Sequence, residues 1–186
     1  KINLGIFRIS KLLNFNSLLI EFINTGLLFN DNISMSASIN ADSKMNKEIF
    51  QEANIKFNIN NGKINLDKSK LINKKIGWLE LENSDLFFKE NKLILNTNLA
   101  IDITDSDALF SFLQTNKKSR KRIRNILINL DYDFLTNEIK FNDIKIDKNE
   151  VSNELLTKIK NLDVNSLNNL NKTRRVINKI FKIYEG

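Results

Sequence analysis

The 186-residue chain contains no cysteine, no histidine and no proline, and these absences exclude several classes of function. Without cysteine it has no disulfide framework, no thiolate nucleophile and no cysteine-based zinc site. Without histidine it has no Ser-His-Asp triad, no imidazole metal ligand and no imidazole proton shuttle near neutral pH. Its five glycines form no phosphate-cradling loop. We therefore expect no catalytic residue, no metal site and no cofactor, and we interpret the protein as non-enzymatic.

The remaining composition is that of a folded domain with an excess of positive charge. Apolar residues make up 41% of the chain, enough for a core, and 29 Lys and Arg against 22 Asp and Glu give a net charge of +7. No stretch approaches the ~20 apolar residues of a membrane span. Because the chain begins at Lys1 inside a patterned segment, we expect a C-terminal fragment of a longer protein, with any targeting segment upstream.

Alternation of apolar and polar residues dominates the first 150 residues and predicts antiparallel β-strands. The clearest unit is a hairpin, in which the alternation over 54–60 meets Asn61-Gly62 and resumes at Ile64 and Leu66. No long βαβ pattern appears, which argues against a parallel sheet. The other strands expected are Leu18–Ile23, Gly26–Ile39, Trp78–Glu82, Leu86–Phe88, Leu93–Ile103, 126–134 and 139–146, with a bulge near Asn142-Asp143.

Helical periodicity is confined to three segments. A short helix over about 105–118 is expected after the long strand, and apolar stripes over 150–160 and 166–184 predict two C-terminal helices. The expected fold class is therefore mainly β (α+β), an antiparallel meander forming a curved β-groove sheet. We expect two regions: 1–148 contains the sheet and the short helix, and 149–186 is a helical pair packed on or beside the sheet.

The sharpest charge cluster is Lys117–Arg124, with six cations in eight residues. It could hold phosphates of anionic lipid head groups or of nucleic acid, or it could be the solvated end of a helix. No aromatic residue interrupts the run, which argues against nucleic acid as the partner. The residues that we expect to attract head groups are Arg120, Lys121, Arg122 and Arg124.

The acidic residues support no metal or catalytic site. Asp102, Asp105 and Asp107 are close in sequence, but they lack the glycine and the following glutamate of a calcium loop. We expect Asp105 or Ser106 to act as a helix N-cap instead. Asp131 and Asp133 alternate with apolar neighbours, so they are interpreted as solvated strand carboxylates rather than a glycosidase pair.

The long apolar strand faces have two interpretations. They could form a closed core covered by the C-terminal helices, or an open curved sheet whose apolar side accepts a hydrophobic ligand. Both arrangements require the same alternation of residues, so the periodicity does not separate them.

Two motifs resemble those of AsmA-like proteins of Gram-negative bacteria. The segment Phe57–Leu66 follows an F-x-I-x-x-G-x-I-x-L pattern, and Gly77–Leu86 follows G-x-L-x-L-x-x-S-x-L. The similarity covers about residues 49–146. It implies a groove-shaped β structure of the cell envelope, periplasmic and tethered to the inner membrane through a segment upstream of residue 1. Related bridge-like proteins carry phospholipids toward the outer membrane along an apolar trough.

This resemblance implies a non-enzymatic module for phospholipid transport or outer-membrane biogenesis. Phospholipid is then the expected partner, and a membrane surface and other envelope proteins are further candidates. The alternative is a structural or protein-interaction β domain with a closed core and no ligand. The side chains expected to hold acyl chains are Phe57, Ile59, Ile64, Leu66, Leu93, Leu95, Leu99 and Ile101.

Overall fold

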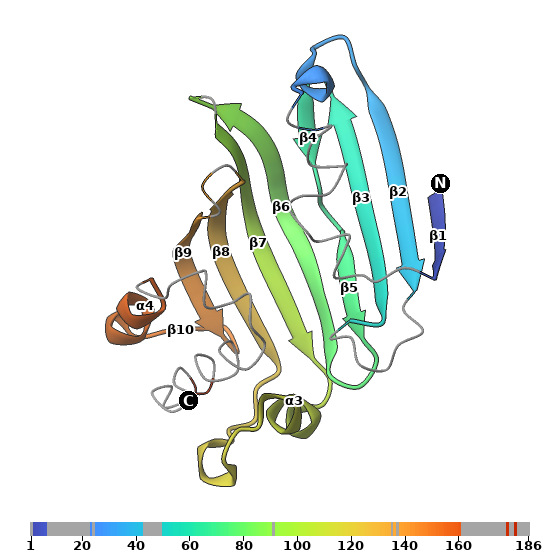
Figure 1. The fold of residues 1–186 in the computed structure, drawn as a ribbon. Coiled ribbons are helices and arrows are strands. Elements are labelled where there is room, and N and C mark those ends of the chain that lie inside the picture. Colours follow the sequence, from blue (N-terminus) through green and yellow to red (C-terminus); the bar gives the residue numbers. More distant parts are fainter. Residues whose placement is uncertain are drawn as a thin grey trace.

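The computed structural model describes residues 2–6, 23, 25–42, 50–90, 92–134, 136, 138–160, 178 and 181. Within them, ten strands form one twisted sheet, with α3 at one end of it and α4 beside β9 (Figure 1). The helical elements are α3 (Ser106–Leu113), α4 (Asn153–Lys160) and the 3-10 turns η1 (Leu27–Phe29) and η2 (Lys117–Ser119). The strands are β1 (Ile2–Ile6), β2 (Met35–Asp42), β3 (Glu52–Asn60), β4 (Lys63–Asn65), β5 (Lys70–Asn73), β6 (Gly77–Lys89), β7 (Lys92–Ile103), β8 (Asn125–Asp133), β9 (Glu138–Ile146) and β10 (Asn149–Glu150).

The sheet confirms the mainly β, α+β fold class. The strand order is β1-β2-β3-β4-β6-β7-β8-β9-β10, and β5 pairs with both β3 and β6. Neighbouring strands run antiparallel except β1 and β2, which are parallel. Alternation within a strand does not encode the direction of its partner, so this exception was not predicted.

The predicted hairpin is present. Asn60 at the end of β3 pairs with Lys63 at the start of β4. Between them Asn61 and Gly62 have φ angles of 47° and 69°, the left-handed conformations that a tight two-residue turn requires. The local sequence therefore determines both the turn and the register of these strands.

The strand boundaries elsewhere differ from the prediction. Trp78–Glu82 and Leu86–Phe88 were expected as two strands, but both belong to β6, which continues through an irregularity between Glu82 and Asp85. Asn83 takes a φ of 49° there, so the alternation changes parity while the strand continues. The bulge predicted near Asn142-Asp143 is confirmed, because the register between β8 and β9 shifts at that point.

The N-terminal strands and the helix lengths also need correction. Gly26–Ile39 is not one strand, because η1 precedes β2 and pairing starts only at Met35. Of the predicted strand Leu18–Ile23, Ile23 is helical and the rest lies outside the described residues. The helix expected to reach residue 118 ends at Leu113, where Gln114 takes a left-handed φ of 58° and closes it.

The C-terminal region is described in part. The predicted helix over 150–160 begins at Asn153, as α4, and residues 149–150 form the short strand β10 instead. Leu155 and Ile159 of α4 are buried against Ile144 of β9. The second predicted helix, 166–184, lies outside the described residues except for Asn178 and Phe181, which are helical.

One face of the sheet is apolar and the other is polar. Buried clusters occupy both ends of the apolar face, around Ile64, Leu86 and Leu93 at one end and around Ile103 and Phe110 at the other. Buried Thr97 is a polar exception on this face, and its hydroxyl hydrogen-bonds to that of Ser84. On the polar face, directly opposed side chains hydrogen-bond across strands: Asn54 to Asn40 (2.6 Å), Asn129 to Asn98 (2.7 Å) and Asn96 to Asp131 (2.6 Å).

Candidate functional site

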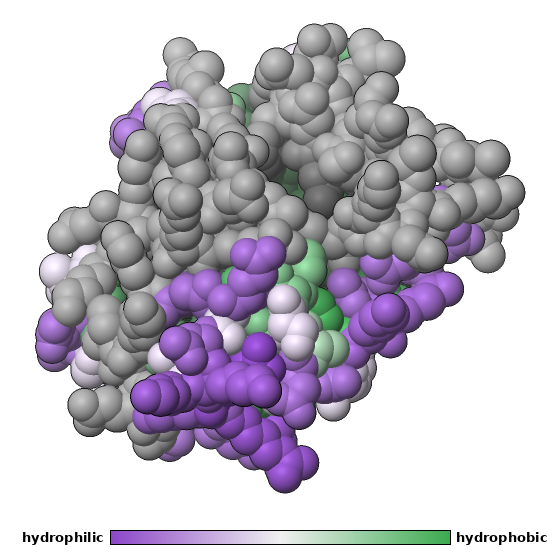
Figure 2. All heavy atoms as spheres, turned by 60° about the horizontal axis from the view of Figure 1, so that its bottom comes forward, coloured by the Kyte–Doolittle hydropathy of each residue, from purple (hydrophilic) through white to green (hydrophobic). Residues whose placement is uncertain are grey.

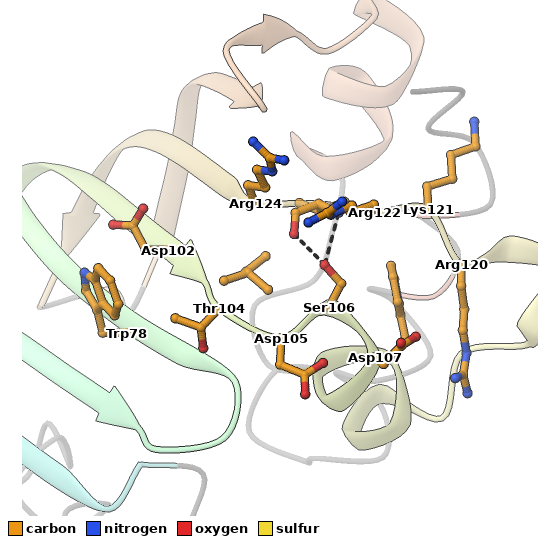
Figure 3. Close-up of a pocket in the computed structure, with 13 residues that line it drawn as sticks. Trp78, Asp102, Thr104, Asp105, Ser106, Asp107, Arg120, Lys121, Arg122 and Arg124 are labelled. Carbon is orange, nitrogen blue, oxygen red and sulfur yellow. Dashed lines mark hydrogen bonds between the residues drawn. The ribbon is translucent and has the colours of Figure 1, made fainter.

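A cavity of about 720 Å³ lies where α3 meets the ends of β6 and β7. Its wall is completed by the segment 120–124, which leads from η2 into β8. Buried Ile103, Phe110 and Ile123 form its apolar part, and the remaining lining residues are polar or charged apart from Trp78. Figure 3 shows Trp78 and Asp102 on one side of it, Arg120 and Lys121 on the other, and Arg122 and Arg124 between them.

Two side chains at the start of α3 cap this helix and hold the basic segment against it. Asp105 accepts a hydrogen bond from the Ala108 N–H (2.9 Å), so of the two predicted N-cap candidates, Asp105 and Ser106, it is Asp105 that caps the helix. Ser106 Oγ donates to the carbonyl oxygen of Ile123 (2.7 Å) and accepts from its N–H (3.3 Å), as the dashed lines in Figure 3 mark. Because the Ile123 side chain is fully buried, its two arginine neighbours are positioned at the cavity wall.

All four predicted head-group residues, Arg120, Lys121, Arg122 and Arg124, line this one cavity. Lys117 and Lys118 lie in η2 and do not line it. The Arg120 side chain is oriented by its Nε, which donates to the Thr115 carbonyl oxygen (3.1 Å). Figure 2, turned to bring this end of the molecule forward, shows mostly hydrophilic residues around a small hydrophobic area among the coloured atoms.

Carboxylates share the cavity with these cations. Asp102, Asp105 and Asp107 all line it, and half-buried Asp102 stands directly opposite Trp78 in the pairing of β6 with β7. No group of three or more potential metal ligands is found in the described part of the chain. From the sequence, Asp102 was considered only as a metal ligand and Trp78 only as part of a strand, although Trp78 is the only tryptophan in the chain.

The side chains predicted to hold acyl chains fall into two groups. Phe57, Ile59, Ile64, Leu66 and Leu93 are buried in one core cluster, and Leu95 packs against it. These five buried residues have little surface to offer a ligand. Leu99 and Ile101 are half-buried.

Around Leu99 and Ile101 lies a group of six half-buried aliphatic side chains, which we name the aliphatic band. It forms two rows that run across the strands. In each row a residue of β7, Leu99 or Ile101, stands between its pairing partner on β6 and its pairing partner on β8. All six share the apolar face. The rows are Leu81–Leu99–Ile128 and Leu79–Ile101–Ile126.

Exposed hydrophobic side chains gather at the other end of the sheet. Phe88 at the end of β6 packs edge-on against Phe29, with ring centroids 4.8 Å apart. The large hydrophobic residues with the highest exposure in the described structure are Leu27, Met35, Phe87 and Phe88. Phe87 and Phe88 lie at the opposite end of β6 from Gly77, and hence far from the cavity, while Leu27 belongs to η1 and Met35 begins β2.

Asp131 and Asp133 are not free solvated carboxylates. Asp131 accepts hydrogen bonds from Asn96 (2.6 Å) and Asn142 (3.1 Å). Asp133 forms a hydrogen-bonded ion pair with Lys92, with Nζ 3.1 Å from Oδ2. The hydrogen bond that Lys92 donates in this pair raises the pKa of Lys92. Both carboxylates therefore help to fix the polar face of the sheet.

Burial raises the pKa of Tyr132 to about 12, with a smaller contribution from the nearby Asp133 carboxylate. Folding therefore favours the neutral phenol, and this contribution to stability is complete below the ordinary pKa of 10 and lost as the pH rises toward 12. We expect the free energy of unfolding to fall between these pH values, and to fall less in Tyr132→Phe. Urea denaturation at a series of pH values measures this, and equal slopes for the two proteins would contradict it.

The described residues include no helix long and apolar enough to cross a membrane. No protein-family model matches the sequence. Searches of curated proteins and of solved structures find no match either. The resemblance to AsmA-like proteins therefore stays a hypothesis that rests on the patterns over 57–66 and 77–86.

Proposed function

We propose that the protein is a non-enzymatic module that holds the hydrophobic chain of an amphiphile, such as a phospholipid. The aliphatic band is the observation that carries this proposal. Its six side chains come from three adjacent strands, face the same side and remain partly accessible. Hydrocarbon bound there would gain ~0.8 kcal/mol for each CH₂ group that leaves water.

The position of the cavity supports an amphiphile rather than a purely apolar ligand. Leu99 and Ile101 of the band and Ile103 of the cavity wall alternate along the same face of β7. Two residues advance a strand by ~6.6 Å, so Leu99 and Ile103 are separated by roughly 13 Å. In this proposal the acyl chain lies on the band and its phosphate head group binds Arg122 and Arg124 at the cavity.

The cellular setting follows from the sequence resemblance alone and is part of the proposal. An AsmA-like module would act in phospholipid transport or outer-membrane assembly, in the periplasm and tethered through an upstream segment. The exposed side chains of Leu27, Met35, Phe87 and Phe88 support contact of this end with a membrane surface.

A second function is favoured by a different observation. Five of the eight side chains predicted to hold acyl chains are buried in one core cluster. This supports the alternative of a structural or protein-interaction β domain that carries no ligand. The two proposals differ in whether the aliphatic band binds anything.

The test is native mass spectrometry of the purified protein, followed by titration with a fluorescent fatty acid. We expect Leu99→Asp to weaken fatty-acid binding at least tenfold, because a carboxylate on the band costs desolvation when hydrocarbon covers it. Asn98→Asp is the matched control. It adds the same charge one residue away on the polar face and keeps the acceptor for the Asn129 amide.

Circular dichroism establishes that both variants are folded before they are compared. Equal loss of binding in the two variants would contradict the band as the site. A folded wild-type protein that binds neither fatty acid nor phospholipid would favour the interaction domain.

A further inference from the structure

We infer that the cavity beside α3 has two subsites of opposite charge and binds a zwitterionic ligand, a phosphate ester that also carries an alkylammonium group. This inference rests on the proposed function in placing a head group in the cavity, but it concerns the chemistry of that group. The cavity, of about 720 Å³, is within the ~300–1,000 Å³ range of small-molecule sites, and a bare phosphate would leave most of it empty.

The anion subsite is formed by the basic segment. Arg122 and Arg124 flank Ile123, which the two hydrogen bonds to Ser106 Oγ fix in place. Arg120 is oriented by its bond to the Thr115 carbonyl oxygen. Guanidinium groups bind phosphate through paired N–H donors, so arginines held by fixed backbone are suited to a phosphate ester.

The cation subsite is formed by Trp78 and Asp102. Their Cα positions are directly opposed across β6 and β7, and strand alternation puts both side chains on the polar face, opposite to the aliphatic band. The cavity lies at the strand ends and is lined from both faces, by Trp78 and Asp102 and by Ile103 and Phe110, so a lipid bound to both subsites would pass around this end of the sheet. An aromatic ring beside a carboxylate is the combination that recognises alkylammonium groups. Lys70 Nζ lies 5.1 Å from the ring centroid and pairs with Glu80 at 2.8 Å, so a ligand ammonium has to compete with Lys70 for the ring, and Asp102 is the group that favours the ligand.

The charges in the cavity do not neutralise each other. Within the described structure, the side chains of Asp102, Asp107, Arg122 and Arg124 make no ion pair and no hydrogen bond, although all four line the same cavity. Opposite charges held apart in one cavity are available to a ligand that carries both. A purely anionic ligand would satisfy the arginines and be repelled by Asp102.

The first experiment compares soluble ligands on the wild-type protein by isothermal titration calorimetry. We expect phosphoethanolamine to bind about tenfold more tightly than inorganic phosphate, since only the former also contacts Asp102 and Trp78. Ethanolamine should compete with phosphoethanolamine but not with phosphate. Phosphoethanolamine binding no tighter than phosphate would overturn the inference without any variant.

Substitutions then assign the subsites. Asp102→Asn should remove the preference for phosphoethanolamine while leaving phosphate binding equal or stronger. Asp107→Asn is the matched control, because it removes the same charge from the cavity on the side away from Trp78, and it should retain the preference (Figure 3). Trp78→Leu tests the same subsite independently should Asp102→Asn not fold. Retention of the preference in both Asp102→Asn and Trp78→Leu would overturn the inference.

A third arm separates this inference from the proposed function. Dihexanoyl phosphatidylethanolamine below its micelle concentration should bind more tightly than phosphoethanolamine if the ligand is a lipid. Suppose instead that the lipid and phosphoethanolamine bind equally tightly, and that phosphoethanolamine still binds more tightly than phosphate. The two subsites would then be supported as a site for a soluble phosphate ester, and the acyl-chain proposal would fail. Fatty-acid binding without any preference for phosphoethanolamine would leave the proposed function standing and overturn the zwitterion site.

Discussion

Replacement of Gly77 by alanine is expected to lower the free energy of unfolding by at least ~3 kcal/mol. Gly77 begins β6 with a φ of 142°, which L-residues rarely adopt. A Cβ atom there would lie 1.9 Å from the carbonyl oxygen of Asp102 and 2.9 Å from its carbonyl carbon. Backbone atoms cannot move aside as a flexible side chain can, so β6 and β7 would have to separate beside the cavity. Urea denaturation measures the loss.

Gly26→Ala is the control for this prediction. Gly26 also has a positive φ, of 75°, but a Cβ atom there would meet nothing within 4 Å. Its substitution should cost only the ~1–2 kcal/mol of a left-handed L-residue. Similar destabilisation by both variants would mean that the close approach of Gly77 to Asp102 has no energetic consequence. The Gly77 variant should also lose ligand binding in the cavity, because Asp102 is displaced.

Phe110→Ala is expected to cost about 3–5 kcal/mol, the usual range for emptying a buried phenylalanine site. Only 2% of Phe110 is exposed. Its ring packs edge-on against Phe181, with centroids 5.4 Å apart, and belongs to the cluster that includes Ile103 and Ile123. The substitution removes the side chain that joins α3 to the end of the sheet and to Phe181. Thermal and urea denaturation would both report the change.

Phe87→Ala is the control for this prediction, because it makes the same substitution at an exposed position. Phe87 is 38% exposed, so its truncation should cost less than about 1 kcal/mol. A Phe110 variant as stable as the Phe87 variant would show that α3 is not anchored through this ring. We further expect Phe87→Ala, and not Phe110→Ala, to reduce association with phospholipid vesicles if the exposed hydrophobic end contacts a membrane.

The hairpin at Asn61-Gly62, an N-cap at Asp105 or Ser106 and a bulge near Asn142 were all predicted correctly. Each is determined by interactions among residues close in sequence: positive φ at a turn, a side chain accepting from a nearby N–H, and a change of parity along one strand. The continuity of β6 was not predicted, because Asn83 interrupts the alternation locally while pairing with β7 carries the strand onward. The parallel pairing of β1 was missed for a similar reason, since partner choice is not local.

The candidate site also combines features that depend on local sequence with features that depend on long-range contacts. The charge run at 120–124 and the apolar parity of the strands were evident in the sequence, because the first is a contiguous cluster and the second a period-2 pattern. The accessibility of an apolar side chain depends on what packs over it. Leu99 is half-buried and Ile64 is fully buried, although both lie on apolar strand faces. Trp78 and Asp102 reached the basic segment only through the pairing of β6, β7 and β8. The sequence by itself determined the alternating faces of the predicted strands, the local turns and the charge cluster. The tertiary structure alone decided strand continuity, strand pairing, burial and which distant charges share the cavity, because all of these depend on long-range contacts.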